Sequence, residues 1–193
     1  AFASLASLVI LVHSVFINSG ILNLGDNLEC IVNSSERKKL NSNHTATHLL
    51  QSALKQLVNI NIGQRGSLVA FDRLRFDFNS PKNITREQLI DIECLINQWI
   101  KEDHNILIKH MLKDDALKAG ALAMFGEKYE DNVRVVDIPG VSMELCGGTH
   151  VESTSELINF KIISESGIAS GIRRIEAISG PSLIDHLKFK SSI

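Results

Sequence analysis

The chain has 193 residues, of which 44% are hydrophobic and 22% are charged, and its formal net charge is −2. These proportions exclude a largely disordered chain, and the near-neutral charge excludes a protein that binds nucleic acid by bulk positive charge alone. The three cysteines are few and widely spaced, which does not indicate a disulfide framework, so we expect a reducing compartment.

The first 17 residues are apolar, but they predict neither a signal peptide nor a membrane span. They lack a basic start, His13 interrupts them, and they are shorter than the roughly 20 residues of a spanning helix. We therefore predict a buried strand over 8–17, within a β-rich segment that extends to about residue 33. The absence of an initial Met suggests a fragment of a longer protein.

Helical periodicity appears next along the chain. Apolar residues at helical spacing predict a helix from about 43 to 58, capped by Ser42 or Asn43, after a charged link at 36–39. Thr85 and Gln88 have the spacing of a capping box and predict a helix over 86–102. Its expected apolar stripe comprises Leu89, Ile92, Ile96, Trp99 and Ile100. Further helices are expected from Asp114 to Phe125 and after Pro181.

The predicted strands do not alternate regularly with these helices. Alternation of Leu74, Phe76 and Phe78 with polar residues predicts a half-buried strand within Ser67–Phe78. Further strands are expected at 133–138, 157–164 and 172–179. This irregular order favours an α+β fold with a mixed or antiparallel sheet.

Two short motifs predict a metal site. His44 and His48 are four residues apart, so on a helix both imidazoles can reach one ion. A helical projection places them away from the apolar stripe, and we do not expect them in the core. Cys146 and His150 have the same separation, and the two glycines between them allow the loop to bend. Neutral imidazole and thiolate are the ligands that zinc selects.

Simpler interpretations of these motifs remain open at this point. The histidines could be a solvated pair at the start of a helix, and Cys146 could be a buried cysteine in a turn. A metalloprotease is not expected, because that motif needs Glu after the first histidine and this chain has Thr45 there.

Five segments follow one another in the chain: NHTATHLLQSAL, GQRGSLVAFDRLRFDF, AMFGEKYEDNVRVV, MELCGGTHV and SGIASGIRRIEAISG. In this order they closely resemble the editing domain of alanyl-tRNA synthetases, and the resemblance extends over about residues 12–180. The resemblance implies an aminoacyl-tRNA hydrolase that clears Ser-tRNA(Ala) and Gly-tRNA(Ala). It also implies one zinc ion, with His44, His48, Cys146 and His150 as the ligands.

The resemblance further implies roles for residues around the ion. Cys146, Gln64 and Thr45 are the candidate catalytic residues, and Gln64 is expected to contact the substrate. Arg173 and Arg174 are candidates for tRNA contacts, with strand-edge charge as the alternative. Because four protein ligands saturate tetrahedral zinc, the ion could be catalytic, substrate-orienting or structural. His150 is the ligand expected to leave most easily, and Glu144 is a carboxylate nearby in sequence.

The implied organisation has three parts. Residues 1–40 would form the end of a small β-barrel-like subdomain, 41–180 the zinc-binding editing domain, and 181–193 a C-terminal helix or the start of a linker. The expected partners are the tRNA(Ala) acceptor end carrying Ser or Gly and the remainder of the synthetase, with no membrane. The low net charge makes that remainder necessary for tRNA delivery. We expect a cytoplasmic location, with an organelle as the alternative. The alternative function is a non-catalytic tRNA-binding fragment with a structural zinc.

Overall fold

The structure is a computed structural model that describes residues 15–123 and 128–191. It divides into two units, which meet between Val32 and Asn33. In the first unit, residues 15–32 contain a turn at Asn23–Asp26 but no strand, and all of their side chains are exposed. The predicted β-rich segment is therefore wrong over residues 15–32, because none of the described strands pairs with their backbone. Its residues 8–14 lie outside the described part of the chain.

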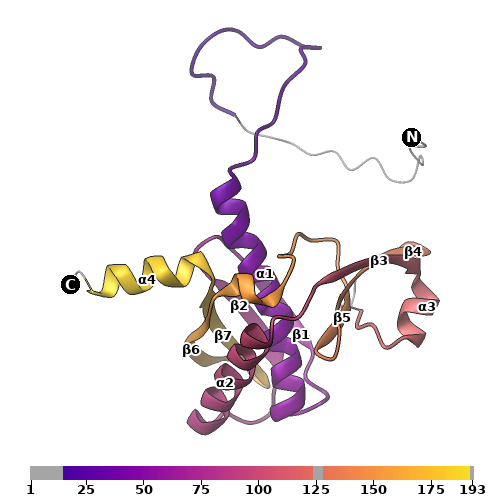
Figure 1. Cartoon of the computed structure of the whole chain (residues 1–193), viewed down its shortest axis with the longest axis vertical. Coiled ribbons are helices and arrows are strands. Elements are labelled where there is room, and N and C mark those ends of the chain that lie inside the picture. The colour runs from indigo at the N-terminus through magenta and orange to yellow at the C-terminus, as the bar shows by residue number, and fades with distance from the viewer. Residues whose placement is uncertain (1–14, 124–127, 192–193) are drawn as a thin grey trace. The chain divides into compact units, whose positions relative to one another are not determined.

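The second unit contains two sheets and the helices around them (Figure 1). The helices are α1 (Ser34–Leu57), α2 (Arg86–Glu102), α3 (Lys113–Lys118), the 3-10 helix η1 (Thr154–Leu157) and α4 (Pro181–Ser191). The strands are β1 (Gln64–Val69), β2 (Leu74–Asn79), β3 (Leu107–Leu112), β4 (Asn132–Ile138), β5 (Ser142–Leu145), β6 (Phe160–Ala169) and β7 (Ile172–Ser179). The predicted α+β class is confirmed.

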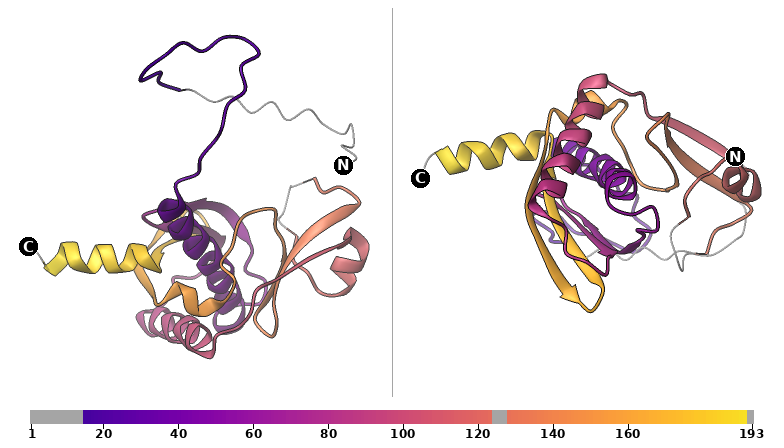
Figure 2. Two further views of the ribbon diagram at one scale, coloured as in Figure 1. Left: turned by 45° about the horizontal axis from the view of Figure 1, so that its top comes forward. Right: turned by 90° about the horizontal axis from the view of Figure 1, so that it is seen from below.

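The larger sheet is antiparallel in the order β1-β2-β7-β6, and helices α1 and α2 cover one of its faces (Figure 2). As the alternation predicts, Leu74, Phe76 and Phe78 all point into the core beneath these helices. The opposite face of the sheet carries charged side chains, including Arg174 paired with Asp77. The smaller antiparallel sheet has the order β3-β4-β5 and packs with α3 around a second, smaller core. Both sheets are open. The barrel-like subdomain that is expected for residues 1–40 precedes them and stays a prediction.

Helix α1 begins well before the predicted position. Its N-cap is Asn33, whose side chain accepts hydrogen bonds from the backbone N–H groups of Ser35 and Glu36. The charged residues 36–39, predicted as a link, form the first turns of the helix. Ser42 and Asn43, predicted as caps, are instead buried inside it. The helix crosses residue 40, where the first of the three expected parts of the chain ends. The division into three parts stays a prediction.

Three other predicted elements change in extent. The segment predicted as one strand over Ser67–Phe78 is a hairpin of β1 and β2, closed by a hydrogen bond from the Ala70 N–H to the Arg73 carbonyl. The helix predicted from Asp114 ends at Lys118, and its predicted end at Phe125 lies outside the described residues. The strand predicted from residue 157 begins at Phe160, after η1.

The remaining predictions are closely matched. Helix α2 begins at Arg86 behind the predicted Thr85–Gln88 capping box, with both of its reciprocal hydrogen bonds formed. Four members of its apolar stripe are buried, and Leu89 packs against the core. Strands β4 and β7 and helix α4 also lie where they are expected. Within the described residues, no helix is long and apolar enough to cross a membrane.

Candidate metal centre

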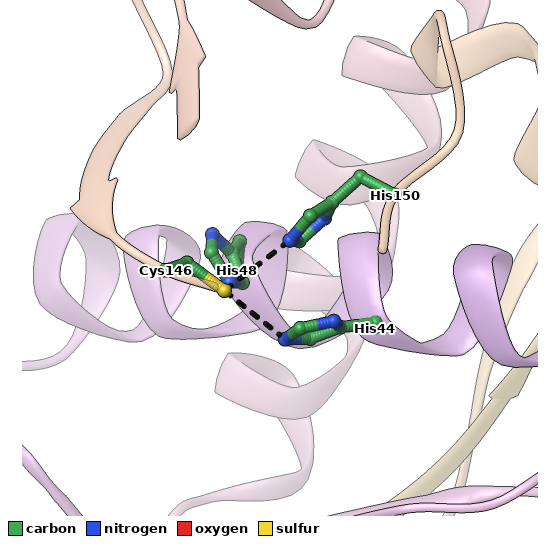
Figure 3. A group of neighbouring side chains, drawn as sticks. All are labelled: His44, His48, Cys146 and His150. Atoms are coloured by element: carbon green, nitrogen blue, oxygen red, sulfur yellow. Dashed lines mark hydrogen bonds between the residues drawn. The ribbon is translucent and has the colours of Figure 1, made fainter. Parts of the chain in front are cut away.

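Four side chains that are predicted as ligands converge on one point in the structure (Figure 3). His44 and His48 project from α1, while Cys146 and His150 lie on the loop that follows β5. The Cys146 Sγ lies 3.5 Å from Nε2 of His44 and 3.4 Å from Nε2 of His150. One ligand atom from each of the four residues lies within 4.8 Å of the others. A spacing of this kind is typical of ligands that surround a single small ion.

Helix α1 is fixed at the site by a buried polar residue next to the first ligand. The amide nitrogen of Asn43 donates to the Ala70 carbonyl in the β1–β2 turn. Its amide oxygen accepts from both the backbone N–H and the hydroxyl of Ser179, at the end of β7. Asn43 therefore joins α1 to two parts of the larger sheet, and His44 follows it directly.

The imidazoles of His44 and His150 are each held at the ring nitrogen that faces away from the cysteine. Nδ1 of His44 donates to the Thr149 carbonyl at 3.2 Å, which leaves the lone pair on Nε2. Nδ1 of His150 lies 3.0 Å from the Thr45 hydroxyl. Metal-bound histidines are usually held in this way, with the nitrogen that does not bind the ion engaged by a nearby group.

His48 is held less completely. Its buried Nδ1 has no hydrogen-bond partner among the described residues, and Oε1 of Glu144 lies 3.6 Å away. The Glu144 carboxyl accepts a hydrogen bond from the Ser142 hydroxyl, and burial raises its pKa to about 7 despite that bond. A shift of a few tenths of an ångström would let this carboxyl accept a hydrogen bond from His48.

Burial keeps the three imidazoles neutral. Loss of hydration lowers the pKa of His44, and it lowers the pKa of His48 to about 3 and that of His150 to about 2. The positive charge of Arg134 contributes in the same direction for all three. Only neutral imidazole has a lone pair for a metal. Three neutral imidazoles and one thiol therefore fit a zinc ion well, because zinc prefers nitrogen and sulfur ligands in a tetrahedral arrangement.

The burial of His48 differs from the expectation. The side chain was expected away from the core, but the residue is only 5% exposed. The helical projection correctly separates it from the apolar stripe of α1, yet the loop after β5 covers that second face of the helix (Figure 3). His48 is thus buried, and His44 and His150 are partly buried, among polar and ligating groups apart from the aliphatic core.

The cluster opens onto a cavity of about 200 Å³. Gln64, predicted to contact a substrate, lines this cavity together with Gln51, Glu144 and three of the candidate ligands, His44, His48 and Cys146. These three residues also line a neighbouring cavity of about 340 Å³, whose other walls include Lys55 and Arg65. The ligand cluster therefore adjoins a polar space that continues toward two cationic side chains. A cavity of about 440 Å³ lies elsewhere, beside α4, and touches none of the four candidate ligands.

Three further candidates have surroundings that indicate roles other than catalysis or tRNA contact: Thr45, Arg173 and Arg174. Thr45 is fully buried, and its hydroxyl contacts His150 and the backbone N–H of Val151. Arg173 binds the carboxylate of Glu165 through two nitrogens, and Arg174 binds Asp77 in the same way. The geometry favours the alternative that both arginines are structural charges of the sheet.

Two residues at the site are not identified by the sequence analysis. Gln51 lies one turn beyond His48 on the same face of α1, so the helical spacing could have indicated it. Arg134 contacts the backbone of the ligand loop from β4, and nothing in the local sequence indicates that contact.

Comparison with known proteins identifies related sequences. Residues 133–176 match the family model of the threonyl and alanyl tRNA synthetase second additional domain. The chain is 58% identical over 184 residues to an alanine–tRNA ligase of Prochlorococcus marinus subsp. pastoris, covering 95% of this chain and 21% of that protein. It is 62% identical over 177 residues to that of another Prochlorococcus marinus strain, covering 92% of this chain and 20% of the relative. It is 56% identical over 184 residues to that of Parasynechococcus marenigrum, covering 95% and 21%.

These matches confirm the resemblance that the motifs indicate. The chain is homologous to a segment of alanine–tRNA ligases, and it spans about one fifth of the length of these relatives.

Proposed function

We propose that this homologue of an alanine–tRNA ligase segment is a hydrolytic editing domain, which uses zinc to cleave the ester of Ser-tRNA(Ala) and Gly-tRNA(Ala). The observation that carries the proposal is the convergence of His44, His48, Cys146 and His150 beside a polar cavity. A purely structural metal site needs no adjoining cavity. The homology supplies the class of substrate, and the cavity supplies a place for its aminoacyl end.

The need for such a site is physical. A synthetic pocket that is shaped for the methyl group of alanine cannot strongly reject glycine, which is smaller, or serine, which adds one hydroxyl. A second site that hydrolyses the wrong product can restore the accuracy that binding alone does not provide.

The proposal assigns each residue of the site a role in the hydrolysis. The three histidines and Cys146 would hold a zinc ion, which supplies electrophilic stabilisation of the negative charge that develops on the ester oxygen. Gln64 lines the same cavity as His44, His48 and Cys146 and would donate a hydrogen bond to the aminoacyl group. Thr45 orients His150 by the contact of its hydroxyl with the outer ring nitrogen, while Glu144 lies 3.6 Å from the outer ring nitrogen of His48. The larger adjoining cavity, with Lys55 and Arg65, would receive the negatively charged tRNA end.

The partners follow from the same proposal. They are the acceptor end of tRNA(Ala) and the remainder of a synthetase, since a chain of net charge −2 lacks the cationic surface for tight independent tRNA binding. The family relationship also favours a cytoplasmic location, with an organelle as the alternative.

One observation favours a second candidate function. Four protein ligands complete the tetrahedral shell that structural zinc sites have, whereas catalytic sites usually retain a position for water. The alternative is therefore a non-catalytic tRNA-binding fragment in which zinc only stabilises the fold. Under the hydrolytic proposal, His150 is the ligand that leaves most easily, because it ends the loop that contains Gly147 and Gly148.

A deacylation assay separates the two functions. The zinc-loaded chain should release serine and glycine from mischarged tRNA(Ala) and spare Ala-tRNA(Ala). Cys146→Ala should reduce this rate at least 100-fold, while Cys94→Ala, which changes an exposed cysteine on α2, should keep it. A folded, zinc-loaded wild-type chain that releases neither amino acid would contradict the hydrolytic proposal and favour the alternative.

A second variant tests the role of Gln64. Gln64→His should slow the clearance of Ser-tRNA(Ala) by about 10- to 100-fold, since the lining of the cavity beside the ligands is altered, while zinc content stays at one per chain. Gln98→His, an exposed change on α2, is the control. Loss of zinc from the Gln64→His variant would instead show that Gln64 supports the metal site.

A further inference from the structure

We propose that Arg134 is a positioning residue, whose side chain holds the loop of Cys146 and His150 in the conformation that binds the metal. The inference rests on the metal centre of the proposed function, but it does not depend on the hydrolytic reaction. It assigns a role to a residue of β4 that lies outside the ligand set.

Two short hydrogen bonds carry the inference. Nη1 of Arg134 donates to the carbonyl oxygen of Cys146 at 2.7 Å and to that of Gly148 at 2.7 Å. The backbone adds a third contact, because the Cys146 N–H donates to the Arg134 carbonyl at 3.0 Å. One residue of β4 thus binds the loop on both sides of Gly147, at the point where the chain leaves β5.

The composition of this loop explains why it needs an external constraint. Gly147 and Gly148 lose more conformational freedom on ordering than other residues do. Neither glycine has a side chain that could fix the loop, yet Cys146 and His150 must come together to bind one ion. A guanidinium that binds the carbonyls before and after Gly147 restricts the backbone between the two ligands.

The chemistry of arginine suits this role better than that of lysine. The guanidinium is planar, always charged and rigid, so it holds two acceptors in a fixed relative position, and hydrogen bonds from a charged donor are stronger than neutral ones. A lysine ammonium can reach a carbonyl, but it does not fix the angle between two of them. The geometry therefore predicts that charge alone is insufficient at position 134.

The test measures metal binding by the 193-residue chain in three variants. Arg134→Met removes both hydrogen bonds, and Arg134→Lys keeps the charge. Lys109→Met is the matched control, because Lys109 lies on β3 in the same sheet and pairs with Asp137, away from the loop. Zinc affinity is measured by competition with a chelator, and the ligand geometry by the absorption spectrum of the Co²⁺-loaded chain.

We expect Arg134→Met to weaken zinc binding by about 10- to 100-fold, the range typical of residues that orient metal ligands. Its Co²⁺ spectrum should lose intensity in the thiolate-to-metal band. Arg134→Lys should have an intermediate affinity, and Lys109→Met should match the wild type. Unchanged affinity and an unchanged spectrum in folded Arg134→Met or Arg134→Lys would overturn the proposal. Failure of both Arg134 variants to fold, while Lys109→Met folds, would also overturn it by showing a general structural role.

The measurement separates this inference from the proposed hydrolysis. A wild-type chain that binds zinc through the thiolate but does not deacylate tRNA contradicts the hydrolytic function only, and the affinities of the Arg134 variants still decide the positioning role. A wild-type chain that does not bind zinc or Co²⁺ contradicts both.

Discussion

The backbone of Gly148 lies directly against the imidazole of His44. A β-carbon at position 148 would be 2.1 Å from Cε1 and 2.6 Å from Nδ1 of that ring, far inside van der Waals contact. The neighbouring Gly147 differs, because a β-carbon there would meet no atom within 4 Å. The two glycines of one loop therefore have different roles: Gly148 allows the close approach of loop and helix, and Gly147 does not restrict it.

This difference predicts opposite outcomes for two single-methyl substitutions. Gly148→Ala should displace either the loop or His44 and weaken zinc binding at least 10-fold, because a ligand would leave its position. Gly147→Ala should bind zinc within about 3-fold of the wild type, since its methyl group points into open space. Chelator competition on both variants checks the prediction. Equal zinc affinities for the two variants would contradict the observed packing of Gly148 against His44.

Removal of the metal should destabilise the whole second unit. An ion that binds only the folded chain stabilises it by about 4 kcal/mol when its free concentration is 1,000 times the dissociation constant. For a chain of this size, that corresponds to a melting temperature roughly 10 °C lower after chelation. Differential scanning calorimetry with and without chelator measures the shift.

The matched variant for that experiment is Cys146→Ala, which lacks the thiolate ligand. Its melting temperature should respond much less to the chelator, since its site holds the ion weakly. Equal melting temperatures of the wild type before and after metal removal would show that the four donors do not hold a stabilising ion.

The sequence predicts best the features that are set locally. Helix α2 is an example, because its apolar period and its Thr85–Gln88 capping box both lie within the segment itself. The convergence of the four candidate ligands is predictable for a related reason: the spacing of the histidines and the cysteine restricts where their side chains can meet. Strands β3 and β5 are missed because all six residues of β3 are at least partly exposed and β5 has only four residues. Their pairing with β4 is a property of the assembled sheet.

The errors in α1 have a physical reason of the same kind. The first turns of the helix carry charged residues and no apolar stripe, so periodicity does not indicate them. Asn43 has the residue type of a cap, but tertiary contacts with Ala70 and Ser179 use its side chain instead. Arg134 and Gln51 reach the site only after the sheet and the helix have come together.

Asn43 and the N-cap residue of α1, Asn33, provide a test of this assignment. Asn43→Ala removes a buried side chain and leaves its hydrogen-bond partners unsatisfied, which should lower the free energy of unfolding by about 3 kcal/mol. Asn33→Ala removes an exposed cap and should lower it by about 1 kcal/mol. Urea unfolding followed by circular dichroism measures both values. A larger loss for Asn33→Ala than for Asn43→Ala would contradict the assignment of Asn33 as the cap and Asn43 as the buried connection.

The ion pair between Arg173 and Glu165 tests whether the arginines of β7 act in the sheet or on tRNA. Both side chains are largely covered, and the guanidinium also donates to Asn83. If Arg173 is a structural charge, Arg173→Gln and Glu165→Gln should each reduce stability, and the double variant should lose less than their sum. A coupling of up to about 1 kcal/mol is expected for such a pair.

The same variants separate the two roles in a tRNA-binding measurement. Glu165→Gln keeps the arginine and removes only its partner, so a structural role predicts that neither single variant changes tRNA affinity more than about 2-fold. A contact between Arg173 and a phosphate predicts otherwise: Arg173→Gln alone should weaken binding and reduce its dependence on salt concentration, because one fewer counterion would be released. Filter binding at several salt concentrations distinguishes these outcomes. Additive stabilities together with a reduced salt dependence would assign Arg173 to the tRNA.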